Sequence, residues 1–62
     1  MNEIRKERKR QGLSQEQLAK NSGLSRYSII NYEKGHRDPK VKDLKKIAKA
    51  LNVSVTELIG KA

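Results

Sequence analysis

The chain has 62 residues, which allows one domain over residues 1–62 with a small core, because a domain this size buries only about 60% of its unfolded surface. It has no cysteine and one histidine, so neither disulfides nor a cysteine–histidine metal cluster is expected to support the fold. Lysine and arginine number 15 against 7 acidic residues, and the net charge of +8 favours a phosphate polymer or an anionic membrane as partner.

No apolar run approaches the roughly 18 residues of a membrane span, and the charged N-terminal stretch lacks the apolar segment of a secretory signal. A basic membrane-surface peptide is also excluded, because the first helix has an apolar face only one isoleucine wide. We therefore expect a cytoplasmic protein with no membrane partner.

Residues 2–11 form the first predicted helix, with an acidic start and a basic end that suit the helix dipole. Ile4 and Arg8 share one face at four-residue spacing, which places a charge beside the core. Glu33 is also a charge placed beside the core, since it lies one turn after Ile29 on the inner side of a later helix. A buried charge is costly unless it is paired, so we predict an ion pair between Arg8 and Glu33. The alternative is that both side chains are partly exposed and merely close.

The stretch from Ser14 to Lys34 predicts two short helices joined by a turn. Ser14 and Gln17 have the spacing of a capping box, and Gly23 suits the left-handed conformation that ends a helix. Ser25 is a second N-cap candidate. Two short helices around a glycine-containing turn form the helix-turn-helix arrangement, whose second helix can enter a DNA major groove.

After a turn at residues 35–39, Asp38 is the predicted cap of a fourth helix, with Pro39 at its first position. The apolar residues that follow recur at three- and four-residue spacing, which indicates one buried face, and Ser54 with Glu57 opens a short fifth helix. The sequence therefore predicts an all-α orthogonal bundle of five short helices. Its predicted core is Ile4, Leu13, Leu18, Ala19, Leu24, Ile29, Tyr32, Val41, Leu44, Ile47, Ala48, Leu51, Val53, Leu58 and Ile59.

Several motifs follow one another along the chain: LSQEQLA at the start, GLS at the turn, YEKG after it, and LNVS with TELI near the end. In this order and spacing they resemble the phage-repressor and Cro-type (XRE-type) helix-turn-helix domain over nearly the whole chain. The resemblance implies a lambda-repressor-like fold and also points to the Arg8–Glu33 pair. Two departures are Ser22, where the family often carries a larger apolar residue, and Lys40, where a capping residue is common.

The outward face of the helix-turn-helix's second helix supplies the predicted base contacts. Steps of about 100° turn Ile29, Tyr32 and Glu33 inward. The same steps turn outward Tyr27, Ile30, Asn31 and Lys34, and Arg26 joins them at the exposed first turn. Arginine suits guanine, asparagine suits adenine, and an apolar group suits the thymine methyl. Ser28 either reads a base or only packs, and Ile30 either covers a thymine methyl or is an exposed residue without a role. The predicted base-reading set is Arg26, Tyr27, Ser28, Ile30 and Asn31.

Phosphate contacts are expected where helix ends offer free N–H groups and where cations follow the second helix. The resemblance nominates Gln15 at the start of the first helix of the motif. The full predicted set is Gln15, Lys34, His36, Arg37, Lys40 and Arg10. For Arg10, the alternative is that the charges of the first helix form only a solvated face.

We therefore expect a sequence-specific binder of double-stranded DNA, a transcriptional repressor or regulator that acts as a homodimer on a palindromic operator. Val55, Leu58 and Ile59 are the predicted dimer surface, although the same residues suit the closing of the core. The alternative function is a protein-interaction module of antitoxin or coactivator type. The sequence indicates no catalytic group, cofactor, metal or small-molecule site, so an enzyme is not expected.

Overall fold

A computed structural model of the chain describes residues 2–59, without the side chain of Asn2. These residues form helices and connecting turns and no strand, in agreement with the predicted fold class. The helices are α1 (Asn2–Arg10), α2 (Gln15–Ser22), α3 (Arg26–Lys34), α4 (Val41–Leu51) and α5 (Val55–Ile59).

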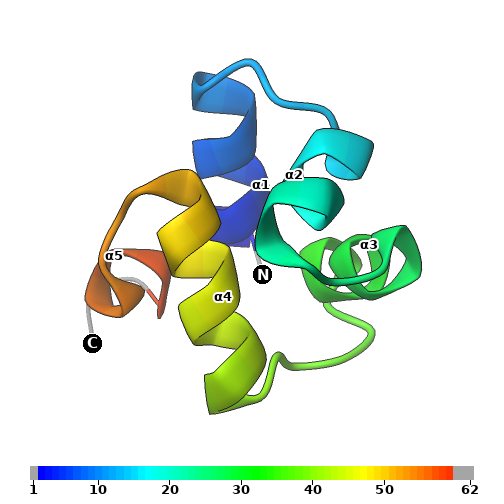
Figure 1. The fold of residues 1–62 in the computed structure, drawn as a ribbon. Helices are drawn as coiled ribbons and strands as arrows, with labels where there is room; N and C mark the ends of the chain where they lie inside the picture. The colour runs from blue at the N-terminus through cyan, green and yellow to red at the C-terminus, as the bar shows by residue number, and fades with distance from the viewer. Residues whose placement is uncertain (1, 60–62) are drawn as a thin grey trace.

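The helices cross one another rather than run parallel (Figure 1). α2 packs against α3 and α4, and α1 packs against α3, α4 and α5. α3 lies on one side of the molecule and α5 on the opposite side, with α1 and α4 between them (Figure 1). Helices this short cannot share a long parallel seam, which is why the predicted orthogonal bundle is the observed one.

Each helix contributes to one shared core, through Ile4 of α1, Leu18 of α2, Ile29 of α3, Ile47 of α4 and Leu58 of α5. The remaining buried apolar residues are Ala19, Tyr32, Leu44, Ala48 and Leu51. Three further predicted core residues are only partly buried and pack against this cluster: Leu13, Leu24 and Val53.

Two residues of the predicted core are in fact exposed. Val41 is 67% exposed at the first position of α4, and Ile59 is 58% exposed at the last position of α5. Both have the three- to four-residue spacing of the buried residues of their helix. Each lies at a helix end, however, where no neighbouring helix covers the side chain. Periodicity predicts which face of a helix is buried, but it does not predict how far along the helix the neighbouring helices cover that face.

The predicted start of α4 was also wrong. Lys40, rather than Asp38, is the N-cap residue, with extended backbone angles (φ −67°, ψ 157°) and no side-chain cap hydrogen bond. Pro39 therefore lies in the loop before the helix. Most of the stability of a short helix comes from packing, and the first buried residue of α4 is Leu44, one turn after Lys40.

No helix among residues 2–59 combines the length and the apolar character that crossing a membrane requires.

Candidate nucleic-acid interface

The ends of α2 are fixed by its own sequence. The Gln17 N–H donates to Ser14 Oγ at 3.0 Å, and the Ser14 N–H donates to Gln17 Oε1 at 2.8 Å, which completes the predicted capping box. Gly23 ends the helix in the left-handed conformation, with φ 75° and ψ 13°. A side chain at this position would be strained, so glycine allows the chain to turn directly into α3.

Ser22 packs under this turn, where a larger apolar residue is common in the family that the sequence resembles. It is buried, and its hydroxyl donates to the Ala19 carbonyl at 3.2 Å. Its Oγ also lies 3.4 Å from the Leu24 N–H. The polar group is therefore satisfied locally, and a serine fits this position without an unpaired buried atom.

An N-cap, two buried side chains and a hydrogen bond to α4 fix the position of α3. Its N-cap is Ser25, whose Oγ accepts from the Ser28 N–H at 3.1 Å. Ile29 and Tyr32 lie fully inside the core, and the Tyr32 hydroxyl donates to Asp43 Oδ2 of α4 at 2.6 Å. The hydrogen bond to Asp43, together with burial, raises the pKa of Tyr32. The Arg37 guanidinium lies over the Tyr32 ring, 5.8 Å from its centroid.

The structure brings Arg8 and Glu33 together as a two-point pair that ties α1 to α3. Arg8 Nε lies 2.6 Å from Glu33 Oε2, and Arg8 Nη2 lies 3.0 Å from Oε1. Both side chains are buried. Arg8 Nη1 also donates to the Leu13 carbonyl at 2.8 Å, and the hydrogen bonds to Glu33 raise the pKa of Arg8. The orientation of α3 therefore depends on α1 as well as on its own apolar residues.

The outward side of α3 carries most of the predicted base-reading residues. Tyr27 is 71% exposed, Arg26 is exposed, and Ile30 is half-buried. Ser28 is half-buried beside the N-cap and accepts a hydrogen bond from the Ser25 hydroxyl at 3.0 Å. Arg26, Tyr27 and Lys34 are thus the exposed residues of the outward side of α3, and Ile30 is only partly accessible.

Asn31 does not point outward as expected. Its side chain leaves the residue only 9% exposed, and its Nδ2 donates to the Tyr27 carbonyl at 3.0 Å. Asparagine readily bonds to the carbonyl one turn earlier in its own helix, which helical-wheel steps alone do not take into account. One N–H of the Asn31 amide is therefore committed to its own helix, which leaves its second N–H and its oxygen for other contacts.

The predicted phosphate-contacting residues fall into two groups. Lys34 and the residues after it are exposed and follow the end of α3: Lys34, His36, Arg37 and Lys40. Gln15 is half-buried at the start of α2 and donates from Nε2 to Glu33 Oε1 at 3.2 Å. Its side chain is thus part of the Arg8–Glu33 network.

Arg10 lies elsewhere. Its Nε donates to Glu7 Oε2 of the same helix at 2.9 Å, and its charge is also attracted electrostatically to Glu57 of α5. Hydrogen bonding to Glu7 raises the pKa of Arg10. Because α5 lies across the molecule from α3 (Figure 1), Arg10 is not grouped with the other predicted phosphate contacts.

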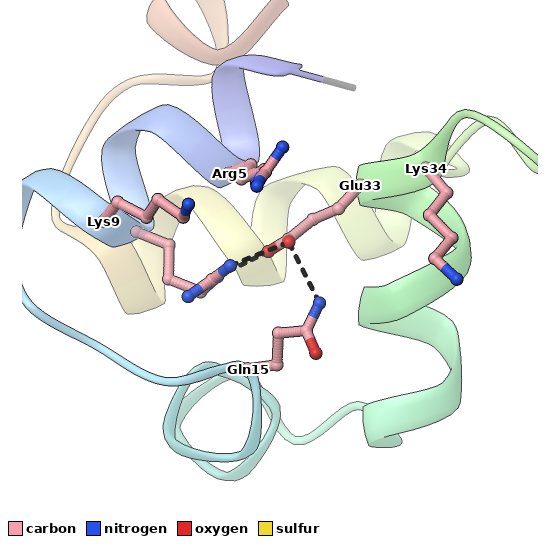
Figure 2. A pocket seen from close by; sticks show the side chains of 6 residues that line it. Arg5, Lys9, Gln15, Glu33 and Lys34 are labelled. Atoms are coloured by element: carbon pink, nitrogen blue, oxygen red, sulfur yellow. Dashed lines mark hydrogen bonds and ion pairs between the residues drawn. The ribbon is translucent and has the colours of Figure 1, made fainter.

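Two cations that the sequence did not single out lie close to α3. Arg5 and Lys9 of α1 are exposed and line a hollow of about 580 Å³. The other lining residues are Arg8, Gln15, Glu33 and Lys34. Arg5 and Lys9 extend from α1 on one side of the hollow and Lys34 from α3 on the other, with Glu33 and Gln15 between them (Figure 2). The sequence feature that could have identified Arg5 is its spacing from Arg8, because Arg5 lies one turn before Arg8 on the same face of the helix.

The predicted dimer residues differ in exposure. Leu58 is 1% exposed and belongs to the core, so it is not available as a dimer contact. Val55 is partly buried against the same cluster, whereas Ile59 is exposed. The alternative use of these residues, closing the core, therefore holds for Leu58.

No three histidine, cysteine, aspartate or glutamate side chains within residues 2–59 lie where they could hold a metal ion together.

Comparison with known proteins identifies relatives of the chain. The HTH-type transcriptional regulator SlrR of Bacillus subtilis is 46% identical over 56 residues, which cover 89% of this chain and 37% of SlrR. The chain thus spans little more than a third of that relative. The restriction-modification controller protein C.AhdI of Aeromonas hydrophila is 38% identical, with a TM-score of 0.89 over 92% of this chain and 86% of that one.

The N-terminal DNA-binding domain of SinR from Bacillus subtilis is 29% identical, with a TM-score of 0.87 over 94% of this chain and 86% of that one. A family model described as helix-turn-helix matches residues 4–58, which is nearly the whole described part of the chain. The chain therefore belongs to the helix-turn-helix family, as its resemblance to the phage-repressor and Cro-type domain predicted.

Proposed function

We propose that the chain is a transcriptional regulator that binds double-stranded DNA and reads its sequence by placing α3 in the major groove. The observation that carries the proposal is the division of α3 into two sides. Its inner side is held by Ile29, Tyr32 and Glu33, and its outer side presents Arg26 and Tyr27 to solvent. The SinR domain, which has the same fold, is a DNA-binding domain, and SlrR is a transcriptional regulator.

Each exposed residue of α3 has a chemical role in this proposal. Arg26, at the first position of the helix, donates to guanine O6 and N7. Tyr27 contacts a base edge beside it, and Ile30 covers a thymine methyl. Asn31 reads adenine with its remaining N–H and its oxygen, and because the residue is only 9% exposed, it makes a smaller contribution than Arg26.

Phosphate contacts fix the position of α3 in the groove without reading sequence. We assign them to exposed residues at and after the last position of α3, which are Lys34, His36, Arg37 and Lys40, and to the start of α2 at Gln15. These groups lie around the C-terminal end of α3, where Gln15 contacts Glu33, and a DNA backbone flanking the groove would pass there.

One domain of this size reads few bases, so we propose that it acts as a symmetric homodimer on a palindromic operator. Two copies of α3 about one DNA turn apart would double the number of base contacts. Occupation of a promoter by such a dimer represses transcription by exclusion. The proposal assigns the chain no catalytic step, and it places the protein with the DNA of the cytoplasm.

Selection of bound sites from random duplex DNA tests the base-reading role. Wild-type protein is expected to enrich a half-site that contains at least one guanine, and Arg26→Ala is expected to lose the preference at that position. Tyr27→Ala should change a neighbouring position. Each good bidentate contact is worth about 1–3 kcal/mol of discrimination, which makes the change easy to detect.

Lys45→Ala is the matched control, because it removes an exposed cation from α4 instead of α3. It should weaken binding slightly and leave the selected sequence unchanged. If the wild type enriches no half-site, or if Arg26→Ala and Tyr27→Ala select the same sequences as the wild type, the base-reading assignment is wrong.

Salt dependence separates this function from a protein-interaction module of antitoxin or coactivator type. For DNA binding, the logarithm of the affinity should fall linearly with the logarithm of the salt concentration, with a slope of about −0.9 for each phosphate neutralised. A partner protein held by apolar contacts would show almost no slope.

A further inference from the structure

The hollow between α1, α2 and α3 has an unusual balance of charge. Its floor is the buried Glu33 carboxylate, whose two oxygens accept three hydrogen bonds, two from Arg8 and one from Gln15. Arg8 cancels the charge of Glu33. The rim carries Arg5, Lys9 and Lys34, so the hollow as a whole has three uncompensated positive charges.

These rim cations are available for a ligand. Within residues 2–59, the side chains of Arg5, Lys9 and Lys34 take part in no ion pair or hydrogen bond. All three are exposed and line the hollow, Arg5 and Lys9 from α1 and Lys34 from α3. Cations held on opposite sides of a concave site favour an anion between them, because each contributes its field to the same point.

We propose that this hollow is a phosphate-binding site, in which Arg5 and Lys9 of α1, together with Lys34 of α3, hold one backbone phosphate of the bound DNA. The inference rests on the proposed function and adds to it a second helix, α1, as a direct contact to DNA. Phosphodiester oxygens are acceptors for both guanidinium and ammonium groups, and the arginine fork can hold two of them.

The position of the hollow favours a phosphate of the DNA backbone. Lys34 is the last residue of α3, and Gln15 is the first residue of α2. A DNA strand that borders the groove occupied by α3 would therefore pass over this hollow. Because Glu33 and Gln15 form its floor, a phosphate seated there would rest on the same network that holds α3 to α1.

The salt dependence of binding to a selected operator tests the site. The double variant Arg5→Gln, Lys9→Gln should reduce the slope of log affinity against log salt by about 0.9, the value for one phosphate. Between 50 and 200 mM salt this corresponds to roughly a three- to fourfold smaller loss of affinity than in the wild type. Base preferences should remain as in the wild type, because phosphate contacts carry no sequence information.

The double variant Lys45→Gln, Lys49→Gln is the control. It removes the same charge from exposed positions at the same four-residue spacing, but on α4. Its slope should stay near that of the wild type. Equal slopes for both double variants would mean that only the general positive field matters, and an unchanged slope for Arg5→Gln, Lys9→Gln would mean that the hollow holds no phosphate; either result overturns the proposal.

Neutral methylphosphonate groups, placed one at a time along the operator, locate the phosphate. One position should weaken wild-type binding more than it weakens Arg5→Gln, Lys9→Gln, since the variant keeps only Lys34 of the three cations at that phosphate. If every position weakens the variant as much as the wild type, the contact does not exist.

A free phosphate compound is the competing source, and pyrophosphate is its probe. Binding of pyrophosphate to the wild type is measured by calorimetry. If Arg5→Gln, Lys9→Gln abolishes this binding and leaves the salt slope of DNA binding unchanged, the hollow binds a free ligand and the assignment to the DNA backbone is overturned. If wild-type protein binds no duplex DNA, the proposed function fails and this proposal fails with it. If the wild type binds duplex DNA and the variant has the same salt slope, only the proposed phosphate site in the hollow is wrong, and the proposed function stands.

Discussion

Arg8 and Glu33 are two charges that the fold takes out of water, and their stability effect follows from how they are paired. Removing one partner of a buried pair leaves the other without compensation. We therefore expect Arg8→Met to lower the free energy of unfolding by about 3–5 kcal/mol, which includes the lost hydrogen bond to the Leu13 carbonyl. Urea denaturation followed by circular dichroism measures the change.

The exposed pair of Arg10 with Glu7 provides the comparison. Arg10→Met should change the free energy of unfolding far less than Arg8→Met does, because surface pairs are screened by water and salt. The double variant Arg8→Met, Glu33→Met should recover much of the stability lost in Arg8→Met, since it leaves no unpaired buried charge. Equal costs for Arg8→Met and Arg10→Met would show that burial does not matter here.

Tyr32 makes stability depend on pH through its hydrogen bond to Asp43. Tyr32→Phe should lower the free energy of unfolding by about 1.5 kcal/mol at pH 7, the lower end for a hydrogen bond to a charged group. The pKa of Tyr32 is raised in the folded protein, so this contribution is complete below the ordinary tyrosine pKa near 10. It should disappear as pH rises through the raised value.

The difference in stability between wild type and Tyr32→Phe isolates this effect, because every other ionisable group is the same in both proteins. Denaturation curves at pH 7, 9 and 11 should give two equal differences and then a smaller one. A difference that persists unchanged at pH 11 would contradict the assignment of the effect to the Tyr32 hydroxyl.

α4 lacks the side-chain cap that α2 and α3 possess. Lys40 already has the extended backbone of an N-cap residue, but its side chain cannot accept the hydrogen bond. Lys40→Ser should therefore raise the free energy of unfolding by about 0.5–1 kcal/mol. Thermal or urea denaturation detects a change of this size.

Lys42→Ser is the matched control, because it makes the same substitution two residues later, inside the helix. There serine should cost up to about 0.5 kcal/mol through its lower helix propensity. Equal effects at the two positions would show that Lys40 is not the cap. If Lys40 also contacts a phosphate, Lys40→Ser should lower DNA affinity while it raises stability.

The sequence predicted those elements whose signals are local. The caps at Ser14, Ser25 and Ser54 are present, with Ser54 Oγ accepting from the Glu57 N–H at 3.1 Å. The cap predicted at Asp38 was wrong because the start of α4 depends on where it packs against α2. A cap pattern shows that a residue is able to begin a helix, and packing decides which candidate does so.

The candidate site was less predictable than the helices, because it depends on contacts between them. Charge and spacing were enough to anticipate that Arg8 and Glu33 would meet. They were not enough to place Asn31 inward, since its amide bonds to its own helix, or to find Arg5 and Lys9 beside Lys34. Arg10 fits a basic surface by composition, yet Glu7 and the position of α1 direct it toward α5.

At the end of α5, one residue closes the core and its neighbour faces outward. Leu58 is fully buried, so Leu58→Ala should cost about 2–5 kcal/mol and lower the melting temperature of the monomer. Ile59 is exposed, so Ile59→Ser should leave the monomer's stability within about 0.5 kcal/mol of the wild type. Leu58→Ala therefore tests the stability of the fold, whereas Ile59→Ser tests the proposed homodimer contact without unfolding the monomer.

Operator binding provides the measurement of assembly. If α5 forms the dimer contact, Ile59→Ser should still bind a single half-site like the wild type but lose the tighter binding to a full palindrome. Analytical ultracentrifugation of the protein with each duplex gives the number of copies bound. Two copies of Ile59→Ser on the palindrome, with wild-type affinity, would mean that the homodimer uses another surface, because the exposed end of α5 would then contribute nothing to holding the two domains together.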